Sequence, residues 1–291
     1  MSNMMERWLL EFLEAPENFW GKGHRQAVKF ARARERLKKI VGSGDAFLKW
    51  IEECLSERAR SDFPTLLIFN AGSSGSHWVQ AMVGDAFGIP GGGEVYLPKC
   101  LRKRARKDFR IIDMVQLVQA GVSERALVLK PIVNTTHSTA MMKLLLSRRG
   151  VKSVFLFRDP VDIVLSRTFR KVDYRKQKAP DATDLEYLDF NIEFVRRVLL
   201  TAMASEFDLC IRYEDLRKRP AAVLKEMSGL TEAMQKDDLI QRVADFYRAE
   251  NLIERKNSGN LFKGVYHSPS RHVVEIARER MQDISYALGY F

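Results

Sequence analysis

The sequence runs Val151-Lys-Ser-Val-Phe-Leu-Phe157 and continues Arg158-Asp-Pro-Val-Asp-Ile-Val-Leu-Ser166, and this stretch is its most informative part. The first segment is an apolar run of strand length. Pro160 can open a helix, where its missing N–H costs nothing, so we expect Arg158 at the C-terminal end of a strand. Ser166 lies about two helical turns further on the same face. A guanidinium and a hydroxyl placed in this way can bind one phosphate from two sides.

A second strand-to-turn junction lies about ninety residues earlier, where Thr65-Leu-Leu-Ile-Phe-Asn70 enters Ala71-Gly-Ser-Ser-Gly-Ser-His-Trp78. An amphipathic segment follows the turn. Backbone N–H groups of such a turn, together with a helix N-terminus, can hold an anion, and glycine lets the backbone approach a phosphate. Many turns of this composition bind nothing, so its pairing with the Arg158–Ser166 element is what favours a phosphate site.

Four apolar segments have the length of buried strands, and helical patterns separate them: 65–70, 126–130, 152–157 and 207–212. This alternation predicts an α/β fold, in which helices flank a parallel sheet in three layers. Ligands of such sheets collect at the carboxyl ends of the strands. We therefore expect the motifs that follow these strands to form one site.

The first sixty residues predict helices over 4–14 and 24–58, with breaks at Pro16–Gly23 and at Gly42–Gly44. We interpret residues 1–60 as a helical extension packed on a main domain of residues 61–291; a partner-binding or dimerisation helix is the alternative. The Gly91-Gly-Gly93 run predicts a loop, and residues 270–290 predict a closing helix.

The chain has 291 residues and 48 Lys and Arg against 37 Asp and Glu, a net charge of +11. This balance favours anionic partners. The segment Lys99–Lys107 has six basic residues in nine, which fits either a solvated helix or a surface for an acidic acceptor. We expect no nucleic-acid partner, because the chain has no zinc-finger or RNA-binding signature.

Three cysteines without CxxC spacing argue against a disulfide framework or a zinc site and favour a reducing compartment. The longest apolar runs are too short to span a membrane, and the N-terminus does not resemble a secretory signal. We therefore expect a cytoplasmic protein; oligomer formation stays open.

On these motifs the chain resembles the sulfotransferases that use 3′-phosphoadenosine 5′-phosphosulfate (PAPS) and release 3′-phosphoadenosine 5′-phosphate (PAP). The loop Gly72–Trp78 resembles their 5′-phosphosulfate loop, and Arg158 to Ser166 resembles their 3′-phosphate element, spacing included. Ile211-Arg-Tyr-Glu-Asp-Leu216, followed by Pro220, resembles a third family segment. The resemblance covers roughly residues 64–230 and implies a P-loop-like sulfotransferase fold of the soluble type, with no metal.

The resemblance also implies roles for single residues. Trp78 and Tyr213 match residues that contact adenine, although a core tryptophan and a tyrosine at the sheet edge are the alternatives. The segment Lys263-Gly264 matches in part a second contact to the 3′-phosphate, as does the run that begins Arg255-Lys256. The 5′-phosphate contacts fall on the loop residues Gly72, Ser73, Ser74, Gly75, Ser76 and His77.

The chain departs from the family in its loop, because Ser73 stands where a Lys or Arg usually stabilises the leaving oxygen, and Ser76-His77 replaces two hydroxyl residues. His77 or Lys130 could supply the charge, or the enzyme could be slow or inactive. His137 precedes Arg158 by about the family distance and is the candidate general base. The alternative for His137 is a surface residue at a helix start.

The resemblance implies sulfuryl transfer from PAPS to a hydroxyl or amine of a small-molecule or glycan acceptor. A catalytically weak or inactive nucleotide-binding module of the same fold is the second reading. A small-molecule P-loop kinase is the third, and the missing Gly-Lys-Ser/Thr argues against it.

Overall fold

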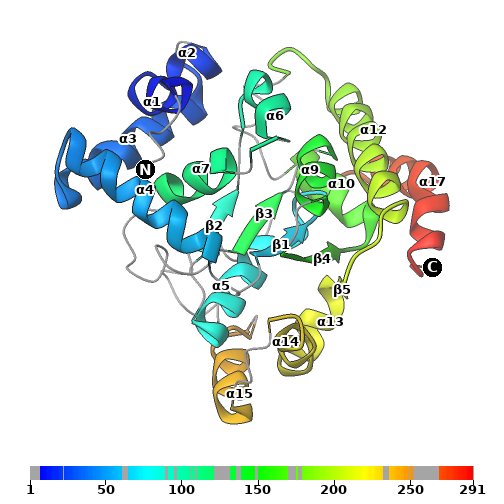
Figure 1. Cartoon of the computed structure of the whole chain (residues 1–291). Coiled ribbons are helices and arrows are strands. Elements are labelled where there is room, and N and C mark those ends of the chain that lie inside the picture. The colour runs from blue at the N-terminus through cyan, green and yellow to red at the C-terminus, as the bar shows by residue number, and fades with distance from the viewer. Residues whose placement is uncertain are drawn as a thin grey trace. The chain divides into compact units, whose positions relative to one another are not determined.

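The computed structural model describes residues 7–21, 23–60, 65–88, 91–94, 97–105, 107–108, 110–120, 132–135, 139–147, 150–169, 175, 179–231, 236–248, 250–251 and 269–290. Helices and strands alternate along the chain, which confirms the predicted α/β class (Figure 1). The strands form a sheet in the order β2-β3-β1-β4-β5. Their bounds are β1 Thr65–Phe69, β2 Gly91–Glu94, β3 Ile132–Thr135, β4 Val151–Phe157 and β5 Leu209–Arg212.

The chain divides into two compact units. Unit 1 comprises Met1–Leu67, Gly88–Asn134 and Lys143–Lys152, and unit 2 comprises Ile68–Phe87, Thr135–Met142 and Ser153–Phe291. The domain boundary predicted between residues 60 and 61 stays a prediction.

Unit 1 contains the N-terminal helices predicted from the sequence. Its helices are α1 Arg7–Glu14, α2 Glu17–Trp20, α3 Arg25–Val41, α4 Asp45–Arg60, α6 Lys99–Ala105 and α7 Arg110–Ala120; the second half of α9, Thr139–Leu146, falls in its last segment. Gly42 ends α3 with a φ of 109°, a backbone conformation that favours glycine. The predicted break between α3 and α4 is thereby confirmed. The four-residue helix α2 lies inside the predicted break at Pro16–Gly23.

The prediction of a loop at Gly91-Gly-Gly93 was wrong, because these residues begin β2. Strand β2 pairs in parallel with β3, with Gly91 opposite Ile132 and Glu94 opposite Asn134. Glycine has a low intrinsic preference for strands, but pairing with a neighbouring strand overrides such a preference. The strand predicted at 126–130 lies outside the described residues.

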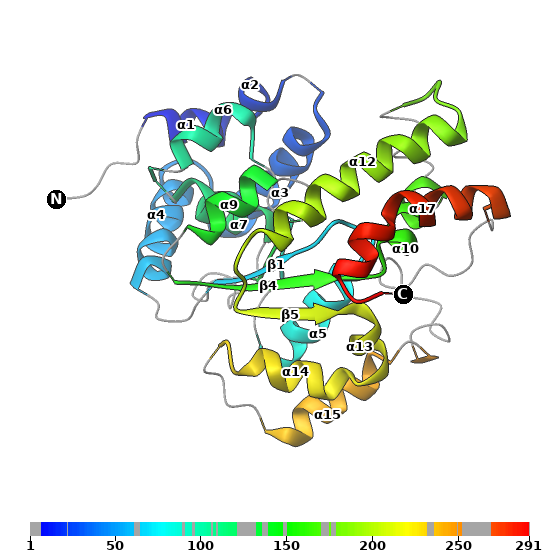
Figure 2. The ribbon, with the colours of Figure 1, turned by 90° about the vertical axis from the view of Figure 1, so that its right-hand side faces the viewer.

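Unit 2 holds β5 and most of β4, which run in parallel from Val154 opposite Leu209 to Phe157 opposite Arg212 (Figure 2). Aromatic rings of these strands and of the segment before β5 pack together. The centre of the Phe155 ring lies 5.3 Å from the centres of both the Phe157 ring and the Phe207 ring. The helices of unit 2 are α5 Ser76–Phe87, α10 Pro160–Phe169, α12 Asp184–Met203, α13 Tyr213–Lys218, α14 Pro220–Ser228, α15 Asp237–Phe246 and α17 Arg271–Ala287.

Helices α10, α12 and α17 pack against one another, and Figure 2 shows α12 and α17 side by side. Arg196 of α12 binds the Asp283 carboxylate of α17 through two hydrogen bonds of 2.6 and 2.7 Å. The predicted closing helix over 270–290 is confirmed by α17. Among the described residues, no helix is long and apolar enough to cross a membrane.

Candidate functional site

The turn between β1 and α5 has an unusual backbone that glycine makes possible. The φ angles of Gly72, Ser73 and Gly75 are 80°, 56° and 82°. Ser73 is the one non-glycine residue with positive φ in the described part of the chain. A serine held in this sparsely populated region is a reason to look for function there.

Contacts from the protein fix the first half of this turn. The Gly72 N–H donates to the Asn70 side-chain oxygen at 2.9 Å, and the Ser74 hydroxyl donates to the Gly72 carbonyl at 3.2 Å. The second half is different: no described residue accepts a hydrogen bond from the backbone N–H of any residue from Ser73 to His77. These donors stand at the N-terminus of α5, which begins with Trp78 N–H bonded to Gly75 O at 2.9 Å. Unpaired donors at a helix N-terminus are suited to an anion.

Arg167 of α10 supports the turn from inside the protein. Its side chain is 2% exposed, and its Nη1 donates to the carbonyl of Ala71 at 3.3 Å. Its Nε donates to the Asn191 side-chain oxygen at 3.2 Å, and the guanidinium lies 4.3 Å from the centre of the Phe194 ring. Arg167 therefore joins α12 to the start of the loop.

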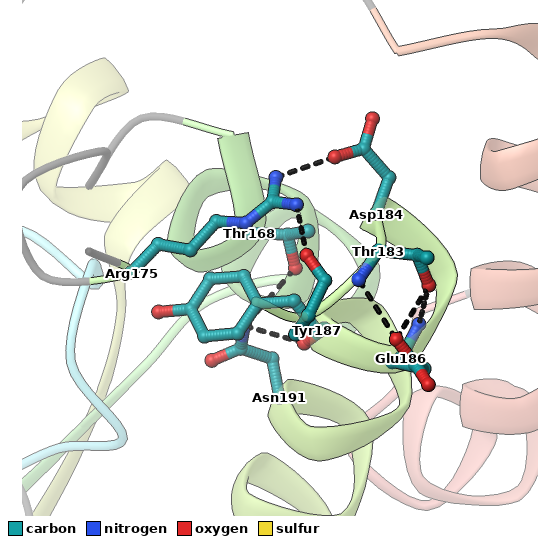
Figure 3. A network of polar contacts seen from close by, with 8 residues as sticks. Thr168, Arg175, Thr183, Asp184, Glu186, Tyr187 and Asn191 are labelled. Carbon is teal, nitrogen blue, oxygen red and sulfur yellow. Dashed lines mark hydrogen bonds and ion pairs between the residues drawn. The ribbon is translucent and has the colours of Figure 1, made fainter. Parts of the chain in front are cut away.

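Asn191 is itself held in place, as Figure 3 shows. Its amide nitrogen donates to the Thr168 hydroxyl at 3.2 Å and to the Tyr187 carbonyl at 2.8 Å. Because both amide hydrogens point away from Arg167, the amide oxygen faces the guanidinium. About two turns before Asn191, Thr183 and Glu186 form a capping box that fixes the start of α12.

Arg158 connects the three motifs. Its Nη1 donates to the Ser73 carbonyl at 3.3 Å, and its guanidinium lies 4.8 Å from the centre of the Tyr213 ring. Its Nη2 forms a 2.6 Å ion pair with Asp162, one turn before Ser166 on α10. The Ser73 carbonyl and the Ser74 N–H belong to the same trans peptide and point in opposite directions. The contact from Arg158 to this carbonyl therefore also orients the Ser74 N–H. Only 13% of the Arg158 side chain is exposed, so these contacts fix the orientation of its guanidinium.

Tyr213 and Trp78 lie next to the loop. The two rings meet edge to face with centroids 5.8 Å apart. Trp78 is 1% exposed, and its indole N–H donates to the Tyr247 carbonyl at 2.9 Å. Trp78 thus has a place in the core, and its predicted contact with adenine stays a prediction. Helix α13 starts at Tyr213 itself.

Gly75 leaves no room for a side chain. A Cβ atom at this position would lie 2.7 and 2.8 Å from two atoms of the Tyr213 ring. Gly75→Ala should therefore destabilise the fold by about 2–4 kcal/mol, through left-handed strain and overpacking. Gly229→Ala is the matched control, because Gly229 is helical with a φ of −61°. Urea unfolding compares the two, and equal stability of both variants would contradict this close packing.

A carboxylate cluster adjoins Arg158. The Asp159 side chain accepts the Val161 N–H at 2.8 Å and caps α10, while its own N–H donates to Glu214 at 3.4 Å. Burial raises the pKa of the Asp159 carboxyl, and the negative charges of Asp162 and Glu214 raise it further. Glu214 also accepts the Tyr290 hydroxyl at 2.6 Å, and burial followed by this bond raises the pKa of that phenol.

The raised pKa of Asp159 makes folding stability depend on pH. Below its ordinary pKa of about 3.9 the carboxyl is protonated in both states, and no penalty arises. As pH rises through the higher pKa of the folded state, the wild type should lose stability relative to Asp159→Asn, which keeps an acceptor for Val161. Asp181→Asn, at an exposed turn, should show no such trend. Parallel unfolding curves of wild type and Asp159→Asn from pH 4 to 7 would contradict the prediction.

The structure brings most predicted site residues together in unit 2. The loop from Gly72 to Trp78, Arg158 and Tyr213 are mutually in contact through the bonds given above. Ser166 is buried in α10, and His77 is exposed in the first turn of α5. Lys130, His137, Arg255, Lys256, Lys263 and Gly264 lie outside the described residues. Among described residues, no group of three or more His, Cys, Asp or Glu side chains could hold a metal.

Sequence reasoning missed Arg167 and Asn191. The signal available was an arginine within the mostly apolar second half of α10, directly after Ser166. A helical arginine usually faces solvent, so the pattern alone did not indicate a buried loop contact.

Solved structures share this fold. The chain is similar to mouse sulfotransferase SULT7A1 complexed with PAP, at 16% identity over 82% of this chain and 92% of that chain, with a TM-score of 0.50. It is also similar to sulfotransferase STF9 from Mycobacterium avium, at 9% identity over 100% of this chain and 98% of that chain, with a TM-score of 0.51. No family model and no curated protein matches the chain. The chain therefore has the fold of the sulfotransferases, as its loop and its Arg158–Ser166 element predicted.

Proposed function

We propose that this protein is a metal-independent sulfotransferase that moves a sulfuryl group from PAPS to a hydroxyl or amine. The observation that carries the proposal is the junction at Arg158. One guanidinium contacts the loop at Ser73 and the ring of Tyr213, so three motifs far apart in sequence meet at one point. The N–H groups of Ser73 to His77, which have no described acceptor, stand beside it.

The nucleotide end of the site divides between two anion sites. Loop N–H groups and the hydroxyls of Ser74 and Ser76 bind the 5′-phosphate, and Arg158 with Ser166 binds the 3′-phosphate. Tyr213 and Trp78 border the adenine. Lys263-Gly264 adds a second 3′-phosphate contact, as the resemblance implies.

When bound, PAPS supplies an electrophilic sulfuryl group on a phosphate oxygen. The residues of the chain hold the phosphates still, direct positive partial charge to the leaving oxygen, and accept one proton from the acceptor. His137 accepts that proton. The loop N–H groups supply part of the positive charge that stabilises the leaving oxygen, and a nearby cation supplies the rest.

The loop of this chain differs from that of the family, because Ser73 occupies the position where a Lys or Arg usually stands. His77 and Lys130 are the candidates from the sequence, and the structure adds Arg167, whose charge is buried against the loop carbonyl of Ala71. Arg167 acts as a positioning residue, since it reaches the site through the loop.

Three substitutions separate these candidates. Loss of the cation that stabilises the leaving oxygen should lower turnover by roughly 10²–10³-fold with little change in PAP affinity, as for other groups aimed at developing charge. His77→Ala or Lys130→Ala should show this pattern. Arg167→Lys, which keeps the positive charge but loses the planar guanidinium with its several donors, should instead weaken PAP binding and turnover together. If none of the three variants changes turnover, the loop N–H groups alone provide the stabilisation.

Transfer of labelled sulfuryl from PAPS to a panel of sugars, phenols, lipids, amines and polyketide hydroxyls tests the proposal. Activity should be the same with magnesium and with a chelator. PAP binding without transfer to any acceptor would favour the inactive module, for which Ser73 is the supporting feature. Metal-dependent transfer from ATP would favour a small-molecule kinase.

The acceptor class and the compartment belong to the proposal as well. A small molecule or a glycan is the expected acceptor. The sequence feature that supports the reducing environment of the cytoplasm is the set of three cysteines without CxxC spacing, Cys54, Cys100 and Cys210.

A further inference from the structure

Helix α3 has a strongly basic sequence, Arg-Gln-Ala-Val-Lys-Phe-Ala-Arg-Ala-Arg-Glu-Arg-Leu-Lys-Lys-Ile-Val, over Arg25–Val41. Seven of its residues are Lys or Arg and one is Glu, so the helix has a net charge of +6. Figure 1 labels it among the blue helices of the first sixty residues. Its basic residues divide into two groups that differ in their contacts.

The inner group has structural contacts within unit 1. Arg34 donates to the carbonyl of Glu14 at the end of α1, at 2.7 Å, and pairs with Glu35 at 2.8 Å. Lys38 pairs with Glu14 at 3.5 Å and lies 5.6 Å from the centre of the Phe47 ring. These cations lie on the side of the helix that carries the buried residues Ala27, Phe30 and Leu37.

The outer group forms a row that we call the basic stripe: Arg25, Lys29, Arg32, Arg36 and Lys39. All five side chains are exposed, and no described residue forms an ion pair or hydrogen bond with any of them. At 100° per residue the five fall within an arc of about 80°, along about 21 Å of helix. The one acidic residue of α3, Glu35, is already paired with Arg34.

Two apolar side chains flank the basic stripe at its edges. Val28 is 41% exposed and Ile40 is 59% exposed, and both lie within about 60° of the centre of the stripe. Exposed apolar groups beside a row of cations suit the lipid interface, where the apolar groups leave water and the cations meet headgroups. Against a nucleic-acid backbone the same apolar groups would gain little.

From these observations we infer that the basic stripe of α3 docks the protein on a membrane surface of anionic lipids. A straight row on a convex helix can touch a plane with all its cations at once. Each basic residue near an anionic bilayer contributes about a fivefold gain in binding. The inference concerns unit 1 and does not depend on the proposed activity.

Co-sedimentation with vesicles tests the inference. Vesicles of phosphatidylcholine with about 30% phosphatidylserine should bind the protein, vesicles of pure phosphatidylcholine should not, and salt should weaken the binding. Arg32→Glu with Arg36→Glu should reduce binding at least about 25-fold, from two lost cations at about fivefold each. Both residues are exposed, so the fold should survive, which urea unfolding checks.

The matched control reverses two exposed basic residues elsewhere, Lys236→Glu with Arg278→Glu, and changes the net charge by the same amount. It should keep most of the vesicle binding. An equal loss in both double variants would overturn the inference, because net charge and not the stripe would then govern binding. So would failure to bind the anionic vesicles, including the case in which a DNA or RNA duplex binds through the same residues.

Discussion

Arg158→Ala should weaken binding of PAP by about ten- to more than a hundredfold, the effect of losing a charge-assisted hydrogen bond. The physical reason is that Arg158 is already oriented. Asp162, the Ser73 carbonyl and the Tyr213 ring hold its guanidinium, so little side-chain entropy is lost when it binds a phosphate. Isothermal calorimetry of PAP and of adenosine 5′-phosphate with both proteins measures the effect.

The pattern across the two nucleotides separates a direct contact from a general loss of structure. Affinity for adenosine 5′-phosphate should fall much less, because that nucleotide has no 3′-phosphate. Arg278→Ala, at an exposed position of α17, should leave both affinities unchanged. An equal loss for PAP and adenosine 5′-phosphate in Arg158→Ala would assign Arg158 to support of the loop through Ser73.

His137→Ala should lower turnover by roughly 10²–10⁴-fold, the usual range for removal of a general base. The sequence places His137 two residues before α9, which begins at Thr139. Affinity for PAP should barely change, since the base faces the acceptor and not the adenosine. Steady-state turnover and calorimetry of the same preparation separate the two quantities.

His272→Ala is the control for this prediction, because His272 is exposed in the first turn of α17. It should have wild-type turnover. Near wild-type turnover in His137→Ala would mean that the base lies elsewhere or that the acceptor needs none.

The parts of the fold that the sequence predicted well are those with strong local signals. Strand β4 ends in the apolar run Val154–Phe157, directly before Arg158, and Pro160 marks the start of α10. The glycine- and serine-rich turn was predicted after the first strand, and its Gly72 and Gly75 have positive φ, a conformation that glycine adopts readily. Such signals are local, since they need only the residue and its neighbours in sequence.

The misses are non-local. Nothing in Gly91-Gly-Gly93 itself predicts a strand, because β2 exists by pairing with β3, which lies some forty residues later. In the same way, Arg167 contacts Ala71 across a separation of 96 residues, and Asn191 orients it from a third segment. A one-dimensional pattern does not contain these distances.

The sequence placed the loop, the Arg158 element and the Tyr213 segment at carboxyl ends of strands, and we expected one shared site there. The structure brings Arg158 into contact with Ser73 and Tyr213, while the binding roles of these residues stay predictions. The sequence did not predict that Arg158 itself forms the junction. The contacts of Arg158 with the Ser73 carbonyl and the Tyr213 ring depend on how the segments are placed in space, and residue types alone do not indicate them.

Calorimetric titration of the wild-type protein with PAP and with adenosine 5′-phosphate tests the central claim most directly. The claim is that the junction at Arg158 and the loop N–H groups form paired sites for a 3′- and a 5′-phosphate. PAP should bind about ten- to more than a hundredfold more tightly than adenosine 5′-phosphate, since only PAP engages both sites. Equal affinity for the two nucleotides, or no binding of either, would contradict the claim.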